Sequence, residues 1–250
     1  MTFRHDFLFL EKTDSTNTYA SLLLQNENVA EGTLIYTREQ LQGAGLGSNI
    51  WVSEPDKNIT ATVILYPEFV APEKQFLLTM LLSVSVCHFL ESLGDGLSPE
   101  IKWPNDIYLN CRKVAGMLIK NNISGSSIQQ TIAGLGLNVN QTIFDSRAPL
   151  ATSLALVTGK NYNIKELLTI WHSKLEKLYE QLKSGNEFYL EQEYMKRFYL
   201  LNRDSAFIIH GEKLIARITG LGEYGQLRLT AADGRNFLCG LKEIEFIPGE

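Results

Sequence analysis

The stretch IKWPNDIYLNCRKVAG, residues 101–116, holds a short apolar run, a polar turn and the start of a second apolar run. This order predicts a β-hairpin with its turn at residues 110–112. Five polar side chains bracket the hairpin, and several of them are expected to converge: Lys102, Asn105, Asp106, Arg112 and Lys113. Lysine and asparagine can bind phosphate oxygens, and a carboxylate or an asparagine can hold Mg²⁺. The alternative is an exposed, charged hairpin that binds nothing.

The segments around this hairpin show both strand and helix patterns. β-branched or apolar runs bounded by turn formers predict strands over residues 32–37, 58–65, 99–103 and 131–139. Apolar residues at helical spacing predict helices over residues 73–93, 164–182 and 187–200, of which the first is apolar almost all round and therefore buried. Together these elements predict a mixed α/β domain over residues 1–201.

After residue 202 the chain consists of short strand patterns separated by glycine-containing turns. The predicted strands are 206–210, 213–219, 226–230, 236–240 and 244–247. Such closely spaced hairpins predict a small β-barrel over residues 202–250. A core of this size is marginal alone, so we expect the barrel to pack on the larger domain.

Composition and charge exclude several classes of protein. The chain has 250 residues, of which 44% are hydrophobic and 20% charged, which excludes disordered and fibrous proteins. Its net charge of −5 is unsuited to a general nucleic-acid coat. No apolar run reaches the roughly 18 residues of a membrane span, and the N-terminus lacks the pattern of a signal peptide. We therefore expect a cytoplasmic protein that binds neither nucleic acid nor membrane.

The cysteines and histidines are scattered. Three cysteines lie far apart, no CxxC, HxxxH or HExxH occurs, and no GxSxG is present. A disulfide framework and a protein-built zinc site are therefore not expected, and nothing supports a serine hydrolase.

Residues 14–17, Asp-Ser-Thr-Asn, precede a helical pattern over residues 18–23. These residue types cap helices, and capping is the simplest interpretation. The same neutral hydroxyl and amide groups at a helix start can also hold a neutral polar ligand.

Two glycine-rich stretches do not suit regular secondary structure alone. Residues 40–51, QLQGAGLGSNIW, match neither GxGxxG nor the P-loop pattern. They fit either a flexible surface loop or a loop whose amides meet an anion while its tryptophan stacks on a flat ring. Residues 133–140, AGLGLNVN, predict a strand whose glycines permit close approach and which delivers Asn138 at its end.

Taken together and in this order, the four stretches resemble one family, the biotin protein ligases (biotin–acetyl-CoA-carboxylase ligases). The resemblance runs from about Lys12 to Asn140 and extends loosely over the C-terminal barrel. It implies an α/β ligase domain related to class II aminoacyl-tRNA synthetases and lipoate ligases, followed by an SH3-like barrel. Many relatives carry an N-terminal helix-turn-helix that represses transcription. Here Ser15 comes too early to leave room for one, so we expect a short form without a DNA-binding domain.

The resemblance also implies an activity. Such enzymes use ATP and Mg²⁺ to activate biotin as biotinyl-5′-AMP, release pyrophosphate, and transfer biotin to a lysine of the carrier domain of a biotin-dependent carboxylase. It leaves open a monomer or a homodimer. Two alternatives stay open: a lipoate or octanoate ligase or transferase, and a non-catalytic biotin-binding regulator.

The resemblance assigns roles to individual residues. Lys113 matches the catalytic lysine beside the biotin carboxylate and the α-phosphate. The groups implied around biotin are Ser15, Thr16, Asn17, Gln40, Ala44, Gly45, Leu46 and Lys113. Those implied around ATP or the adenylate are Trp51, Lys102, Asn105, Lys113 and Asn138, with Asn138 and Asp106 as Mg²⁺ ligands.

The glycine loop departs from the family pattern at three positions. Ala44 replaces a basic residue, Leu46 a polar one and Ser48 a glycine. The loop therefore lacks one cation that would grip the adenylate phosphate, unless Arg38 or Lys57 compensates.

Overall fold

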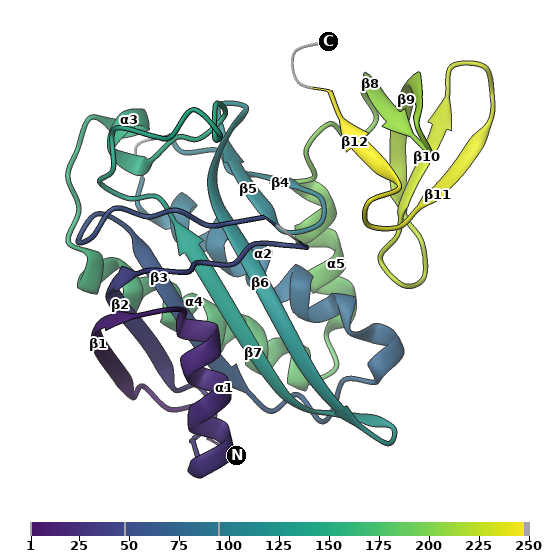
Figure 1. Cartoon of the computed structure of the whole chain (residues 1–250). Coiled ribbons are helices and arrows are strands. Elements are labelled where there is room, and N and C mark those ends of the chain that lie inside the picture. The colour runs from purple at the N-terminus through teal and green to yellow at the C-terminus, as the bar shows by residue number, and fades with distance from the viewer. Residues whose placement is uncertain (1, 48, 95, 248–250) are drawn as a thin grey trace.

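The computed structural model describes residues 2–47, 49–94 and 96–247 and contains two β-sheets (Figure 1). The larger sheet has seven strands in the order β1-β2-β3-β7-β6-β5-β4. β1 and β2 are parallel and all other neighbours are antiparallel, so this sheet is mixed, as the sequence predicted. Its strands are β1 (Phe7–Thr13), β2 (Leu34–Gln40), β3 (Ile59–Leu65), β4 (Glu100–Lys102), β5 (Asp106–Leu109), β6 (Arg112–Ser124) and β7 (Ser127–Leu137).

Helices cover both faces of this sheet. Figure 1 shows α1 (Thr16–Asn26) in front of the sheet and α4 (Ile164–Lys183) behind it. α2 (Phe76–Ser92) packs against α4 and α5 (Glu187–Lys196) on the α4 side. Two short elements complete the layer, a 3₁₀ turn at Pro72–Lys74 and α3 (Leu154–Thr158).

The interior strand β3 shows why the two faces differ. Ile59, Ala61, Val63 and Leu65 point into the main core, which also contains the apolar side chains of α2. The alternate residues face α1, where Ile64 joins a small cluster around Ala20. Thr60 and Thr62 occupy the rest of that face. The face under α1 therefore has polar groups next to a small apolar cluster, and the candidate site forms there.

The C-terminal sheet has five antiparallel strands in the order β11-β10-β9-β8-β12, as expected for a small barrel. It packs on the larger domain through Trp103, whose Nε1 donates to Gly225 O at 2.8 Å, and its buried side chains belong to the main core. The domain boundary near residue 202 stays a prediction. Its strands are β8 (Asp204–Ile209), β9 (Glu212–Leu221), β10 (Leu227–Ala231), β11 (Asn236–Cys239) and β12 (Ile244–Phe246).

Most predicted elements are present, with two differences that have a physical cause. β1 was not predicted, because its start, Phe-Leu-Phe-Leu, lacks alternation; as an edge strand it is only partly buried. The last helix ends at Lys196 rather than at residue 200. Ile101 N donates to Arg197 O and Tyr199 N donates to Ile101 O, so the chain leaves the helix to pair with β4.

One segment among the described residues, Pro72–Ser92, is long and apolar enough to cross a membrane by length and composition. The expectation that no segment reaches that length is therefore wrong. The segment includes α2, and 67% of its apolar window is buried inside the protein, as in the core helix of a water-soluble protein.

Candidate active site

A cavity of about 170 Å³ opens between the start of α1, the loop after β2 and the strands β6 and β7. Most of the residues singled out in the sequence line it. They are Ser15, Thr16, Asn17, Gln40, Ala44, Gly45, Leu46, Trp51, Asn105, Asp106 and Lys113. Four stretches that are distant in the sequence therefore meet in one place.

One end of this cavity is neutral, polar and buried. Thr16 N donates to Gln40 Oε1 at 3.0 Å, and Asn17 Nδ2 donates to Leu118 O at 3.0 Å. The Thr62 hydroxyl lies 2.8 Å from Thr16 Oγ1 and 2.6 Å from Asn17 Oδ1. These bonds fix the first turn of α1 against β2, β3 and β6.

Ser15 occupies the cap position of α1, but its hydroxyl makes no capping hydrogen bond. The capping interpretation is therefore wrong for its side chain. With the other described residues the Ser15 hydroxyl and the Gln40 amide nitrogen form no hydrogen bond. Both line the cavity and can bind a ligand.

Glycines form the floor of the cavity. Gly134 and Gly136 of β7 face the site, and a Cβ atom at Gly134 would lie 2.8 Å from Asn17 Nδ2. A Cβ atom at Gly136 would lie 2.7 Å from Trp51 Nε1. Close approach at these glycines, predicted from the sequence, is confirmed.

The other end of the cavity carries charge. Lys113 Nζ lies 2.7 Å from Asp106 Oδ1 and 5.7 Å from the centre of the Trp51 ring. The side chains are 33% and 23% exposed, so the pair is reachable from the cavity. The Lys113 backbone is held on both sides, because its N donates to Leu150 O and its O accepts from Thr152 N. Asn105 Nδ2 donates to Met117 O, which fixes the amide beside this pair.

The glycine loop folds back on itself above the site. Gly45 N donates to Asn49 O and Trp51 N donates to Gly43 O, both at 2.8 Å. The loop thus places the indole of Trp51 in the cavity, where its buried Nε1 has no hydrogen-bond partner among the described residues. The other two indoles, of Trp103 and Trp171, each have one. Ser48, one of the departures in this loop, lies outside the described residues.

A second cavity of about 500 Å³ adjoins the first and shares Trp51 and Lys113 with it. Asn138 lies here and not in the first cavity; it is 4% exposed, and its Nδ2 donates to Thr152 O at 2.9 Å. Lys102 lines neither cavity. Its Nζ lies 3.2 Å from Tyr108 Oη and 4.9 Å from the centre of the Phe246 ring, and burial lowers the pKa of Lys102.

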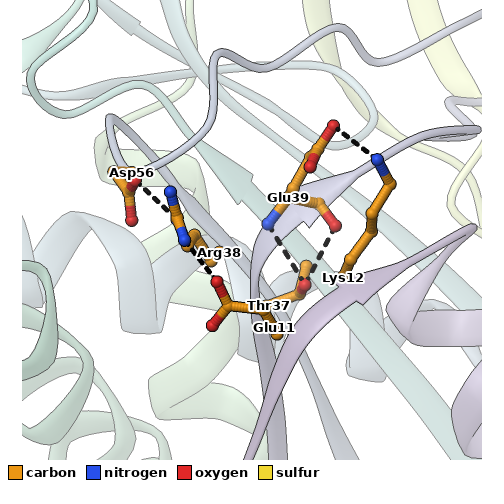
Figure 2. A network of polar contacts seen from close by, with 6 residues as sticks. All are labelled: Glu11, Lys12, Thr37, Arg38, Glu39 and Asp56. Carbon is orange, nitrogen blue, oxygen red and sulfur yellow. Dashed lines mark hydrogen bonds and ion pairs between the residues drawn. The ribbon is translucent and has the colours of Figure 1, made fainter.

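Arg38 is engaged away from the glycine loop. It forms ion pairs with Glu11 and with Asp56, the latter at 2.6 Å, beside a pair between Lys12 and Glu39 (Figure 2). Arg38 lines neither cavity and is bound by two carboxylates, so it does not replace the cation missing at Ala44. Lys57 lines neither cavity either.

Two residues of the site were missed from the sequence. Thr62 orders Thr16 and Asn17, and its position two residues after Thr60 in an apolar strand is a usable signal, because alternate residues share a face. Arg147 lines the second cavity, where its guanidinium pairs with Asp145 at 2.8 Å and lowers the pKa of that carboxyl to about 2. An arginine in an irregular loop carries no such signal.

The two predicted metal ligands line adjoining cavities. Asp106 lines the first cavity and pairs with Lys113, whereas Asn138 lines the second. Within residues 2–47, 49–94 and 96–247, no group of three or more histidine, cysteine, aspartate or glutamate side chains could hold a metal ion. A Mg²⁺ site at Asp106 and Asn138 therefore stays a prediction.

The sequence model described as the biotin/lipoate A/B protein ligase family matches residues 9–138, more than half of the chain. The chain belongs to this family. The matched range contains the polar end, the glycine loop and the Lys113–Asp106 pair, and it ends at Asn138. The match therefore covers the first cavity, and the predicted family is confirmed.

Individual relatives agree with this assignment. The bifunctional ligase/repressor BirA of Bacillus spizizenii is 35% identical over 140 residues, which cover 55% of this chain and 42% of that protein. A biotin–[acetyl-CoA-carboxylase] ligase of Paracoccus denitrificans is 34% identical over 137 residues, covering 52% and 53%. The chain thus spans about half the length of these relatives.

The solved biotin protein ligase of Aquifex aeolicus superimposes with a TM-score of 0.80 at 24% identity, covering 98% of this chain and 100% of that one. This likeness includes the C-terminal sheet and confirms the predicted fold.

Proposed function

We propose that the protein is a biotin protein ligase that forms biotinyl-5′-AMP and transfers biotin to a carrier lysine. The observation that carries this proposal is the pair of adjoining cavities that share Lys113 and Trp51. The first cavity suits biotin and the second the nucleotide. Lys113 then stands where the biotin carboxylate would meet the α-phosphate.

The neutral end of the first cavity favours biotin over lipoate. The ureido ring of biotin has two N–H donors and one carbonyl acceptor, whereas the dithiolane ring of lipoate has no strong hydrogen-bonding group. Ser15 and Gln40 offer a free hydroxyl and a free amide nitrogen beside Thr16 and Asn17. Buried polar groups need partners, so a ligand without them would leave this end unsatisfied.

In the first step an oxygen of the biotin carboxylate attacks the α-phosphorus of ATP. The bond from that phosphorus to the bridging oxygen breaks, and pyrophosphate leaves. Two anions must approach each other, so an aimed cation stabilises the transition state more than the ground state. Lys113 is that cation, and Asp106 holds its ammonium group in place until the ligands arrive.

Magnesium enters this proposal with ATP, as part of the substrate complex. Mg²⁺ keeps several waters and binds through substrate phosphates and one or two carboxylates, so Asp106 and Asn138 need supply only part of its coordination. Asn138 and Arg147, both in the second cavity, are candidates to contact the nucleotide. Lys102 is assigned a supporting role, because it packs beneath Tyr108, which lines that cavity.

In the second step the amine of a carrier lysine attacks the acyl carbonyl carbon, and AMP leaves with the bonding electron pair. The mixed anhydride must be shielded from water between the steps, and the glycine loop is the segment placed to do this. The proposed carrier is a biotin carboxyl carrier domain, and the name of the Paracoccus relative gives acetyl-CoA carboxylase as what that enzyme acts on. A cytoplasmic location and a monomer or homodimer stay predictions.

The decisive experiment supplies purified protein with ATP, Mg²⁺ and biotin and measures pyrophosphate release, then adds a biotin carrier domain and measures its labelling. Parallel reactions replace biotin with lipoate or octanoate. We expect biotin-dependent pyrophosphate release and carrier labelling. Activity with lipoate alone would make the protein a lipoyl-type ligase, and biotin binding without pyrophosphate release would make it a non-catalytic regulator.

A further inference from the structure

The turn between β11 and β12, residues 240–243, has a fixed shape. Glu243 N donates to Gly240 O at 3.3 Å, and Gly240 N donates to Glu243 Oε2 at 2.6 Å. Lys242 within the turn has φ of 71°, a left-handed conformation that is uncommon for a residue with a side chain. These hydrogen bonds hold the turn in one shape, and Leu241 and Lys242 extend from it.

This turn meets the glycine loop at two points. Leu46 of the loop and Leu241 of the turn line one cavity of about 200 Å³, which also reaches Asn105 at the edge of the biotin cavity. At the next loop residue, a Cβ atom on Gly47 would lie 3.5 Å from Lys242 Cε and 3.9 Å from its Nζ. The loop thus lies beside this turn, with Leu46 and Leu241 on a shared cavity and Lys242 next to Gly47.

The charge of Lys242 is free to act on a ligand. Its ammonium group has no hydrogen bond or ion pair with a described residue. Two other cations of this region are engaged, Lys113 by Asp106 and Arg38 by two carboxylates. Charges attract over about 8 Å at physiological ionic strength, so Lys242 need not touch the adenylate to retain it.

Resting on the proposed function, we propose that the turn at residues 240–243 positions the glycine loop over the adenylate, with Leu241 seating Leu46 and Lys242 supplying the positive charge that position 44 lacks. A loop with three glycines loses much conformational entropy when it orders, and a rigid neighbour that it can pack against offsets part of that cost. Lys242 is a positioning residue, because it lies beside the loop and not in the cavity with Lys113.

The first test measures how long labelled biotinyl-AMP stays bound after free ligand is removed. We expect Lys242→Ala and Leu241→Ala each to speed its loss about tenfold, which corresponds to about 1.4 kcal/mol. Lys242→Arg should keep the slow loss of the adenylate. Adding Ala44→Arg to Lys242→Ala should restore the slow loss. Ala44→Arg alone should change the rate of the wild type by a smaller factor. High salt should weaken the effect of Lys242→Ala but not that of Leu241→Ala. Lys196→Ala, at an exposed lysine of α5 that lines none of these three cavities, is the matched control.

The second test does not need catalysis. Hydrogen exchange of the loop amides at residues 43–51 is compared in the unliganded wild type and in Leu241→Ala, and we expect faster exchange in the variant. Unchanged exchange there, or an unchanged rate of adenylate loss in both alanine variants, would overturn the proposal. If the wild type releases no pyrophosphate, the proposed function fails, and hydrogen exchange alone then decides whether the turn holds the loop.

Discussion

The two ends of the first cavity are built differently. At the neutral end, Thr16 and Asn17 are 4% and 5% exposed and are bound to three strands. At the charged end, Lys113 and Asp106 are partly exposed, and the nearby indole of Trp51 has an unpaired donor. The neutral end is therefore already in its binding geometry, whereas the charged end has groups whose partners must change when a ligand arrives. Under the proposed function, the rigid end would recognise biotin and the adaptable end would carry out the chemistry.

The largest expected effect tests the charged end. Lys113→Ala should leave the melting temperature nearly unchanged and lower adenylate formation at least about 100-fold, because one aimed charge contact is worth about 2.7–4 kcal/mol in a transition state. Pyrophosphate release in single turnovers measures this, with Lys12→Ala on the exposed side of β1 as control. A folded variant with wild-type release would remove Lys113 from the chemistry.

The next prediction tests the rigid end. Gly134→Ala forces a methyl group against the Asn17 amide, and overpacking of this kind costs about 1–3 kcal/mol. We expect biotin affinity to fall at least about tenfold, since 1.4 kcal/mol corresponds to a factor of ten. Titration calorimetry with biotin measures the change, and Gln129→Ala near the other end of β7 is the control. Unaltered affinity would show that Asn17 can move, which contradicts a preformed end.

A third variant tests whether the Thr62 hydroxyl orders Thr16 and Asn17 at the neutral end or whether Thr62 only packs there. Thr62→Val removes the hydroxyl between Thr16 and Asn17 and should destabilise the protein by about 1–3 kcal/mol while weakening biotin binding. Thr60→Val is the matched variant, because Thr60 faces the same side but bonds to Thr37 O. It should lower stability without changing biotin affinity. Denaturant unfolding together with calorimetry distinguishes the two, and equal effects on affinity would contradict a specific role for Thr62.

The smallest expected effect is a pH-dependent change in the stability of the fold that supports both ends of the cavity. His172 forms no hydrogen bond with a described residue of the site, and its Nε2 lies 2.6 Å from Gly32 O. Burial lowers the pKa of His172 below its usual 6.5. The unfolded chain then binds more protons than the folded one between the lowered pKa and about 6.5, so stability falls as pH falls through that range.

The slope from this one group is at most about 1.4 kcal/mol per pH unit. Urea unfolding of the wild type and of His172→Gln at several pH values measures this slope. The pH values cover about 5–8, the range in which a histidine titrates. An identical pH slope in the variant would show that other groups dominate. If the structure of both ends of the cavity were then lost at mildly acid pH, a group other than His172 would be the cause.

Local patterns in the sequence were sufficient to predict most of the helices and strands and to identify the family. The β-branched run that became β3, the apolar segment that became α2 and the turn-rich C-terminal region each carry their structure in short-range periodicity. The motifs at residues 14–17, 40–51, 101–116 and 133–140 also identified the family, because residue types at those spacings are chemically specific. The edge strand β1 was missed because its pattern lacks the alternation that a half-buried strand usually shows.

What only the tertiary structure decided is which polar group meets which. Lys102 and Lys113 lie in the same hairpin motif, yet one packs under Tyr108 and Phe246 and the other enters the cavity. Arg38 is near the glycine loop in sequence but is bound by Glu11 and Asp56, whereas Lys242, almost two hundred residues later, reaches Gly47. The residue types and their local spacing are properties of the sequence. Pairings between distant segments depend on strand order and on the face to which each side chain points, and these are settled only when the whole chain packs.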